Sequence, residues 1–415
     1  MISFIVYKKL ARTKVSLPRE LSFRRGNLVP ANVITDRQCS RSRWAHQARR
    51  GSASALGIVL IGVMAVFLGM TVDLGYIHVS QSELRRTSDA AALAACWELF
   101  DAKVDGLSGD EVIQRVAASA DQFGSQNKVA RSYPNVSSQG DDITLGYFDI
   151  ATKQFDADST LEHNAVRVNV HRQGHTNGEV PLFFGTVLGR QTQPMTSTSI
   201  AALLNTISGF HVPSTDSQTL DILPFALDED TWQSVVNGET EDQLSWSGGR
   251  VVSTGNGKCE CNLYPQGTGS PGNRGTVDIG SANNSTKDIS RQILHGISRD
   301  DLLAMGTPFE FDSQGEMLLN GDTGISAGVK DELASIIGEK RMIPVFRQVQ
   351  GNGNNAMYTI VKFVGVRILE VKLTGRMSGK RLIVEPATVV ARNAIVSSDG
   401  SSYSDFVYTP VMLVD

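Results

Sequence analysis

The strongest candidate for nucleophilic chemistry in this sequence is Ser326, at the centre of the pentapeptide GISAG (residues 324–328). The pattern G-x-S-x-G is typical of a nucleophile elbow, in which a strand precedes the serine, a helix follows it and a downstream histidine takes its proton. The last histidine of the chain is His295, which precedes Ser326, so the usual order of acid and then histidine is impossible. We therefore predict that Ser326 begins a helix and is not a nucleophile.

An overlapping tripeptide, Asp322-Thr323-Gly324, is similar to the sequence around the catalytic carboxylates of aspartic proteases. That chemistry needs two carboxylates that share one proton. The tripeptide occurs once in this chain, so a second copy of the chain would have to supply the other carboxylate. Because residues 320–321 (Asn-Gly) precede it in place of a buried strand, we interpret the tripeptide as a turn.

Two histidines, His171 and His175, lie four residues apart, with His163 and Glu179 nearby. On a helix this spacing would place both imidazoles on one face, where they would bind zinc. The alternating pattern before them and Gly174 between them indicate a strand and then a loop. We therefore predict exposed loop histidines.

The stretch GNGK (residues 255–258) superficially resembles a phosphate-binding loop. A P-loop needs a glycine where this chain has Val252, and a serine or threonine where it has Cys259. These two departures exclude a phosphate loop.

The distribution of charge along the chain is strongly asymmetric. The 415 residues carry a net charge of −4, and 41% of them are hydrophobic, which excludes a wholly disordered chain. Residues 1–50 hold twelve Lys and Arg against two acidic residues, a net charge of +10, and the remainder carries −14. A basic arm joined to an acidic body indicates either nucleic-acid binding or a membrane topology signal.

An uncharged stretch from Gly51 to Val72 favours the membrane interpretation. As a helix, Ala53–Val72 has about 20 residues and is about 30 Å long, which matches the hydrocarbon core of a bilayer. The positive-inside rule places the preceding basic arm in the cytoplasm and everything after Asp73 outside.

Three other interpretations of the N-terminal segments stay open. A cleaved secretory signal has a shorter apolar stretch and a small-residue cleavage site directly after it, whereas here the nearest alanine-rich run begins at Ala90. A buried helix of a soluble protein is the second. The third is a DNA-binding arm, although no reading motif accompanies the charges.

Helical character continues beyond the apolar segment. One mildly apolar stripe with steps of three and four residues predicts a single long helix to about Leu99, either packed or a plain stalk; its members are Leu74, Ile77, Gln81, Leu84, Ser88, Ala91 and Ala95. Ser108 and Glu111 form a capping-box pattern ahead of a second helix that carries Val112, Val116 and Phe123.

The sequence pattern after these helices is typical of β-strands. The stretch Ile143–Ile150, followed by Phe155, predicts a hairpin. Ala165–His171 alternates valines with polar residues, which predicts a half-buried strand. A further strand around Ser197–Leu204 would complete a small antiparallel sheet.

Several of these stretches share one likeness. Arg49-Arg50-Gly51, the apolar span, Asp73-Leu74-Gly75, Gln81 and the run at residues 89–94 (DAAALA) resemble the N-terminal anchor region of TadG-like proteins of the Flp pilus (tight adherence) system, within the Tad-type pilus assembly family. The stretches GYFD (146–149), Phe155, NAVRV (164–168) and PLFFG (181–185) resemble the extracytoplasmic continuation of the same proteins. The resemblance covers about residues 49–205.

This resemblance implies a bacterial inner-membrane protein that is held by one N-terminal helix and contributes to the assembly or anchoring of an adhesive pilus. Pilin-type processing requires a glutamate five residues after the cleavage glycine, whereas Leu56 stands at that distance from Gly51. Cleavage by a prepilin peptidase is therefore not expected. Many TadG-like proteins carry a von Willebrand factor A domain with a D-x-S-x-S metal site, but this sequence lacks that pentapeptide.

With this topology, Cys39 is expected in the cytoplasm and Cys96, Cys259 and Cys261 outside. A ring closed by Cys259 and Cys261 would be strained. Pairing of either one with Cys96, pairing between chains, and free thiols all stay open.

The C-terminal half carries no likeness that we recognise, but its pattern predicts an α+β domain after a boundary within Asn205–Asp221. Irregular loops are expected in the Gly/Ser-rich passage Ser245–Asn284, helices at Lys287–His295 and Gly328–Ile337, and a turn at residues 352–354. The expected strands are Met342–Val349, Met357–Val364, Val366–Leu373, Leu382–Val390 and Phe406–Val414.

The sequence thus predicts an α+β protein in which a transmembrane helix continues into a long helix, followed by a small antiparallel sheet domain and a second α+β domain. The expected segments are a cytoplasmic arm (1–50), a transmembrane helix (51–73), a TadG-like extracytoplasmic region (74–205) and a second extracytoplasmic domain (206–415). We expect a non-enzymatic, single-pass inner-membrane protein with an assembly, anchoring or adhesion role in a pilus or the cell envelope. It would contact the lipid bilayer and pilus-assembly or envelope proteins but no nucleic acid, and we expect no catalytic residue, cofactor or metal. The alternatives are a membrane-anchored hydrolase and an extracytoplasmic ligand-binding module.

Overall fold

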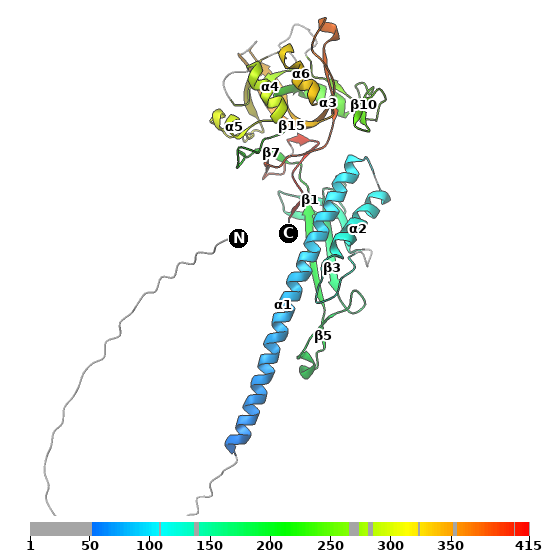
Figure 1. Cartoon of the computed structure of the whole chain (residues 1–415), viewed down its shortest axis with the longest axis vertical. Helices are drawn as coiled ribbons and strands as arrows, with labels where there is room; N and C mark the ends of the chain where they lie inside the picture. The colour runs from blue at the N-terminus through cyan, green and yellow to red at the C-terminus, as the bar shows by residue number, and fades with distance from the viewer. Residues whose placement is uncertain are drawn as a thin grey trace, which may run out of the picture. The chain divides into compact units, whose positions relative to one another are not determined.

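The computed structural model describes residues 52–107, 109–136, 141–264, 274–280, 285–322, 324–351, 355–401 and 403–414. The expectations for the basic arm, Cys39, Ser108 and the turn at residues 352–354 lie outside these ranges. Within them the fold is a mixed α+β arrangement in which a long helix is followed by a shorter helix, a small antiparallel sheet and a second, sheet-rich part (Figure 1). The predicted fold class is confirmed.

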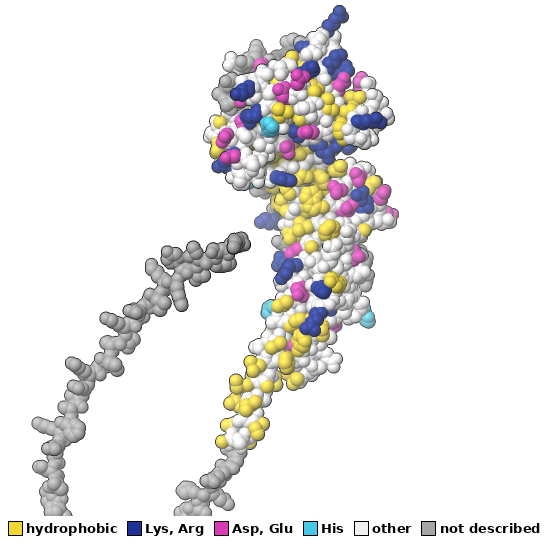
Figure 2. Space-filling view, viewed as in Figure 1, with side chains coloured by type: hydrophobic (Ala, Val, Ile, Leu, Met, Phe, Trp, Pro, Cys, Tyr) yellow, Lys and Arg dark blue, Asp and Glu magenta, His cyan; other side chains and the backbone are white. Residues whose placement is uncertain are grey.

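Helix α1 (Ser52–Val104) is unbroken for 53 residues and carries the apolar segment and the polar continuation on one axis. Among the described helices, α1 is long and apolar enough to cross a membrane. Hydrophobic side chains cover its first part, and charged side chains appear further along (Figure 2). The predicted continuous helix is confirmed and ends at Val104, five residues beyond the expected Leu99.

The second half of α1 is packed and is not a bare stalk. Its buried line follows the helical repeat through Gly69, Asp73, Ser80, Leu84, Ser88, Ala91 and Ala95. The predicted stripe is therefore right from Leu84 onward. It is wrong at Leu74 and Gln81, which are exposed, because the polar Asp73 and Ser80 occupy the buried positions there.

Helix α2 (Asp110–Gly124) packs against α1. Gly109 occupies its N-cap position, and the predicted capping box involves Ser108, which lies outside the described residues. Arg115 joins the two helices by ion pairs to Glu98 at 2.6 Å and to Asp105 at 2.9 Å. Val112 and Val116 are buried as expected, whereas Phe123 is exposed.

The first sheet has the order β2-β1-β3-β6-β21 and lies along α1 (Figure 1). Its first four strands are β1 (Ile143–Asp149), β2 (Gln154–Asp156), β3 (Ala165–Arg172) and β6 (Met195–Ala202). The predicted hairpin forms with Phe148 opposite Phe155, and β3 pairs antiparallel with both β1 and β6. The valines of β3 are buried, so the predicted half-buried strand is also confirmed. This sheet, α1 and α2 enclose one apolar core.

The edge strand β21 (Met412–Leu413) pairs with β6 although it lies far along the chain. The predicted continuous strand 406–414 is broken into β20 (Val407–Tyr408) and β21. Pro410 lies between them and has no N–H for a ladder. Tyr408 packs edge-on against Phe100 of α1, with 6.1 Å between ring centroids.

The second sheet has eight strands among the described residues. Five of them, β8, β12, β13, β14 and β15, pair in a closed ring, because β15 bonds to both β13 and β14 and β8 bonds to both β12 and β14. A closed ring leaves no open edge among these five strands. The eight strands are β8 (Phe225–Asp228), β11 (Cys261–Asn262), β12 (Arg274–Val277), β13 (Met317–Asp322), β14 (Lys340–Gln350), β15 (Ala356–Lys372), β16 (Arg381–Pro386) and β19 (Ser404–Asp405).

Three expectations for this sheet are wrong. The two strands expected at 357–373 are one strand, β15, because Gly365 allows Ala387 and Phe406 to approach; a Cβ there would lie 2.3 Å from the Ala387 carbonyl oxygen. The strand expected at 382–390 divides after Pro386 into β16 and β17 (Val389–Val390). The Gly/Ser-rich passage contains β9 (Ser245–Ser247), β10 (Arg250–Val252), β11 and β12, so it is not wholly irregular.

Short elements complete the fold. The helices α4 (Thr286–His295) and α6 (Lys330–Ser335) lie where the sequence predicts them, although α6 is shorter and follows the 3₁₀ turn η2 (Ala327–Val329). The remaining elements are β4 (Val180–Pro181), η1 (Gly185–Leu188), β5 (Thr192–Gln193), β7 (Ile207–Phe210), α3 (Glu229–Val236), α5 (Arg299–Met305), η4 (Met377–Gly379) and β18 (Ala394–Val396).

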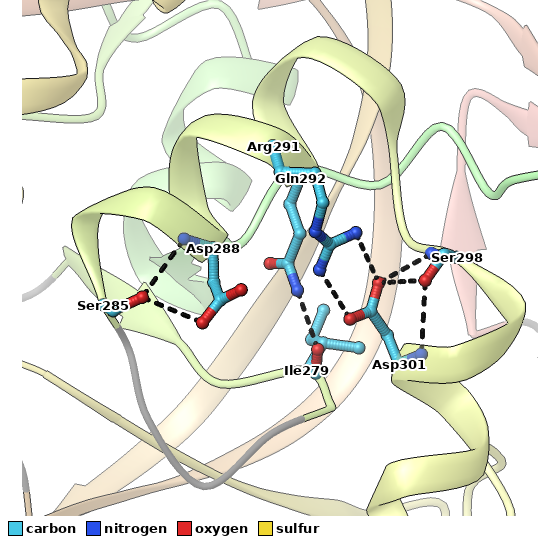
Figure 3. Close-up of polar contacts among 7 residues, drawn as sticks. All are labelled: Ile279, Ser285, Asp288, Arg291, Gln292, Ser298 and Asp301. Carbon is cyan, nitrogen blue, oxygen red and sulfur yellow. Dashed lines mark hydrogen bonds and ion pairs between the residues drawn. The ribbon is translucent and has the colours of Figure 1, made fainter.

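A polar cluster fixes α4 and α5 to each other (Figure 3). Arg291 of α4 donates two hydrogen bonds, at 3.0 and 2.6 Å, to the carboxylate of Asp301 in α5. Asp301 also accepts from the backbone and hydroxyl of Ser298 and completes a capping box. Burial alone would raise the pKa of Asp301, but the hydrogen bonds from Arg291 and Ser298 outweigh it and the pKa is lowered.

Asp301→Ala leaves Arg291 without its carboxylate and removes the Asp301 half of the capping box of α5, while the N-cap residue Ser298 stays in place. We expect the free energy of unfolding to fall by about 3 kcal/mol, measured by denaturant titration of the full chain in detergent. Because the folded pKa lies below the ordinary value of 3.8, this stabilisation is present above pH 3.8 and is lost as the pH falls through the folded pKa.

The matched control is Asp300→Ala, which changes an exposed carboxylate on the same helix. We expect it to change the free energy by less than about 0.5 kcal/mol. Equal effects of the two substitutions would contradict the role of the Arg291–Asp301 pair.

Candidate functional site

The junction between α1 and the first sheet is the best-defined polar contact surface of the α1 region. Ser88 of α1 is fully buried, and its hydroxyl lies 2.9 Å from that of Ser197 and 2.7 Å from that of Ser199, both on β6. Ser199 in turn donates to the carboxylate of Asp89 at 2.6 Å. Small hydroxyl side chains therefore bring the helix and the sheet close together while they satisfy each other's hydrogen bonds.

At the end of this junction that is nearest the apolar segment lies Asp73, the first charged residue after that segment. Its side chain is 6% exposed, and its two oxygens accept the backbone N–H groups of Phe183 at 2.8 Å and Phe184 at 2.9 Å. A charged acceptor makes such bonds stronger than neutral pairs. Asp73 thus clamps the loop between β4 and β5 onto α1.

The aromatic rings of this loop pack on α1 around the clamp. The ring of Phe184 lies directly over Gly69, where an added Cβ would stand 2.7 Å from its Cγ, so only glycine permits this approach. Phe183 makes an edge-to-face contact with Tyr76 at 5.2 Å. The Arg131 guanidinium lies 5.9 Å from the centroid of the Phe183 ring.

Arg131 is held there by a turn that α1 also secures. Glu83 of α1 accepts the backbone N–H of Ala130 at 2.8 Å, and the buried Arg172 donates to the carbonyl of Val129 at 2.6 Å. Ala130 and Arg131 have positive φ angles of 48° and 70°, a costly conformation that these bonds maintain. Burial lowers the pKa of Arg172, and nearby Tyr76 offsets part of that effect.

The three cysteines that the structure describes lie in two separate cores. Cys96 is buried between α1 and the sheet, where burial raises the pKa of its thiol to about 12 although nearby Lys103 partly offsets the rise. Cys259 and Cys261 belong to the core of the second sheet. Neither is bonded to Cys96 in the structure, so of the open alternatives the pairing with Cys96 is not observed.

The serine of the G-x-S-x-G pattern caps a turn. Ser326 is exposed, and its hydroxyl oxygen accepts the backbone N–H of Gly328 at 3.2 Å at the start of η2. The prediction that Ser326 begins a helix is confirmed. Asp322 ends strand β13, which includes Asn320 and Gly321, so the expectation of no strand before the D-T-G tripeptide is wrong.

The histidine pair falls on a strand and the turn that follows it. His171 lies in β3, with its ring nitrogens 3.1 Å from the Thr196 hydroxyl and 3.2 Å from the Asp142 carboxylate, whereas His175 is exposed in the turn. The prediction of a strand and then a loop is confirmed, but the prediction of exposed loop histidines is right only for His175, because His171 is a partly buried strand residue. Among the described residues no group of three or more His, Cys, Asp or Glu is placed to hold a metal ion.

The GNGK stretch binds a carboxylate of its own chain. The backbone N–H groups of Asn256 and Gly257 donate to Asp242 at 3.0 and 2.8 Å, and a Cβ at Gly255 would meet the same carboxylate at 2.5 Å. The donors that a phosphate would need are therefore already bound.

Comparison with known families fits this geometry. Residues 51–104, which are almost the whole of α1, match the family described as putative Flp pilus-assembly TadE/G-like. Residues 90–201, which run from late α1 through β6, match the family described as putative Tad-like Flp pilus-assembly. Residues 51–201 are a Tad-like region. No curated protein and no solved structure matches the chain.

The Tad-like region therefore includes both sides of the junction, since α1 and the strands that it packs on lie within residues 51–201. Sequence reasoning quoted Asp73 and the PLFFG stretch separately and missed that they bind each other. The available signal was a lone carboxylate at the exact end of an apolar span, where a buried charge needs donors.

Asp73→Asn replaces two carboxylate oxygens by one amide oxygen. Hydrogen bonds to a charged acceptor contribute about 1.5–3 kcal/mol, so we expect the loop to lose about 2 kcal/mol of local stability. That loss corresponds to about 30-fold faster hydrogen exchange at the amides of Phe183 and Phe184, measured by mass spectrometry in detergent. Asp89→Asn, which alters a carboxylate bound to Ser199, is the matched control and should leave these two amides unchanged. Unchanged exchange in Asp73→Asn would contradict the clamp.

Proposed function

We propose that this protein is a single-pass inner-membrane protein with an assembly, anchoring or adhesion role in a Flp/Tad-type pilus or the cell envelope. The match of residues 51–201 to pilus-assembly families supports the system in which it acts. The observation that carries the anchoring role is the continuity of α1. One helix presents an uncharged, exposed surface over its first twenty residues and then becomes part of a folded core.

The charge pattern supports an orientation. Residues 1–50 carry +10 and directly precede the apolar segment, so we place them in the cytoplasm. The regions 74–205 and 206–415 then lie outside, where they meet pilus-assembly or envelope proteins. The basic arm acts as a topology signal that lies against anionic lipid, with no role in nucleic-acid binding.

We infer a structural function in place of a catalytic one. The hydroxyl of Ser326 is engaged in a backbone cap, and the N–H groups of the GNGK loop bind Asp242. Both features that favour a hydrolase or a nucleotide-binding module in the sequence thus have structural roles. The continuous helix and its clamped loop favour transmission of position or force between the membrane and the folded body.

The topology is tested by the native cysteines. In intact spheroplasts we expect a membrane-impermeant maleimide to label Cys259, which is partly exposed, and to label Cys39 only after lysis. Cys96 is the internal control, because its buried thiol with a pKa of about 12 should stay unlabelled until the protein is denatured. The protein should also stay in the membrane pellet after an alkaline wash. Labelling of Cys39 in intact spheroplasts would contradict the orientation.

The role is tested by deletion of the gene, followed by electron microscopy of pili and a surface-adhesion assay. We expect loss of pili or of adhesion, with full restoration by the wild-type gene and by Ser326→Ala. The Ser326→Ala variant separates the two classes of function, since a hydrolase that depends on this serine would not be restored. Normal piliation and adhesion in the deletion strain would refute the proposed role.

A further inference from the structure

We propose that the loop at residues 182–188, hereafter the apolar loop, inserts into the outer leaflet of the same membrane and forms a second anchor beside α1. This inference rests on the proposed membrane anchoring by α1. The partner of the apolar loop is lipid, and the loop lies at the boundary between the headgroups and the acyl chains. Four observations support it.

The first observation is composition and exposure. Four large apolar side chains within six residues are exposed: Phe183 (52%), Phe184 (46%), Val187 (70%) and Leu188 (58%). They lie on the loop between β4 and β5 and on its short helix η1. Contiguous exposed apolar side chains of this kind mark an interaction surface.

The second observation is depth. Phe184 packs on Gly69, which belongs to the uncharged span that ends at Val72. Gly69 lies four residues before Asp73, which is about 6 Å along the helix axis. A bilayer that covers the uncharged span of α1 therefore also covers the loop that packs on its last turn. The same geometry determines the occupant, because the surface of α1 beside the loop is the proposed lipid-facing surface.

The third observation is that backbone N–H groups of the loop are hydrogen-bonded within the protein, as a bilayer without water requires. Buried N–H groups in lipid need partners inside the protein. The N–H groups of Phe183 and Phe184 bind the carboxylate of Asp73, that of Leu182 binds Gln191, and that of Arg190 binds Gly185. The clamp thus removes from lipid two donors that irregular backbone would otherwise leave unpaired.

The fourth observation is the polar rim. Tyr76 and Arg131 pack on Phe183 on the side of the loop that faces the folded body, and Arg190 is exposed where the loop ends. Tyrosine and arginine are favoured at the headgroup level, where an apolar stem meets lipid and a polar end meets water or phosphate. The loop therefore has an apolar tip and an interfacial rim.

The test uses the full chain in vesicles of phosphatidylethanolamine and phosphatidylglycerol. Its four native cysteines are replaced (Cys39→Ser, Cys96→Ala, Cys259→Ser and Cys261→Ala), and one new cysteine carries an environment-sensitive fluorophore. Val187→Cys and, as a second position, Leu188→Cys probe the loop. Leu60→Cys reports the membrane segment of α1. Leu318→Cys, an exposed apolar position on β13, is the matched control for a water-facing leucine.

We expect the emission of the probe at positions 187 and 188 to shift to the blue and to be quenched by nitroxide-labelled lipid as strongly as at position 60. The probe at position 318 should respond only to the water-soluble quencher iodide. Far-UV circular dichroism checks that each variant is folded.

Three outcomes would overturn the proposal, and they are distinguishable. Lipid quenching at position 60 with iodide quenching at 187 and 188 leaves the α1 anchor intact and refutes the membrane-inserted loop. Protection of 187 and 188 from both quenchers indicates a protein that covers the loop, such as a second copy of this chain. Iodide quenching at position 60 refutes the anchoring by α1 and with it the loop.

Discussion

The carboxylate of Asp73 joins the end of the apolar segment of α1 to the loop between β4 and β5. Without it, this loop would contact that end of α1 through the aromatic rings of Phe183 and Phe184. Asp73 is the first charged residue of α1. Its carboxylate accepts hydrogen bonds from the backbone N–H groups of Phe183 and Phe184, which lie 110 and 111 residues further along the chain. Around it, Gly69 admits the ring of Phe184, and Tyr76 packs on Phe183. A buried carboxylate costs free energy unless it is well bonded, so the loop geometry and the carboxylate require each other. The end of the apolar segment is thereby fixed to one end of the sheet.

Further along α1, smaller polar groups also form hydrogen bonds between the helix and residues that are distant in the sequence. Ser88 meets Ser197 and Ser199 through hydroxyls, and Ala91 and Ala95 are buried in the core that α1 shares with α2 and the sheet. Hydroxyl pairs between a helix and a sheet are directional, so they define the register of the helix as well as its distance. A helix held in this way from Gly69 to Ala102 behaves as one body with the sheet.

The elements that local pattern determines were predictable from the sequence, and those that depend on distant partners were not. The length of α1 and the alternation of β3 follow from periodicity alone. The interruptions of the predicted strands at Pro386 and Pro410 could have been inferred from the missing N–H of proline, but the strand propensity of the neighbouring residues obscured that signal. The continuity of β15 through Gly365 needed knowledge of the carbonyls of Ala387 and Phe406, which approach it from elsewhere in the chain. The Asp73 clamp was hidden for the same reason, since no local rule pairs a carboxylate with amides more than a hundred residues away.

The edge strand β21 has a consequence for the order in which the chain folds. The contact between Leu204 and Thr409, which bond at 3.1 Å, joins residues 205 positions apart, and β21 closes the sheet beside β6. Because the chain is synthesised from its N-terminus onward, α1 and the first four strands of this sheet exist while the edge at β6 is still unpaired. An unpaired edge strand is a template for pairing with other chains. During folding, therefore, this incomplete sheet is the stage most vulnerable to misassembly.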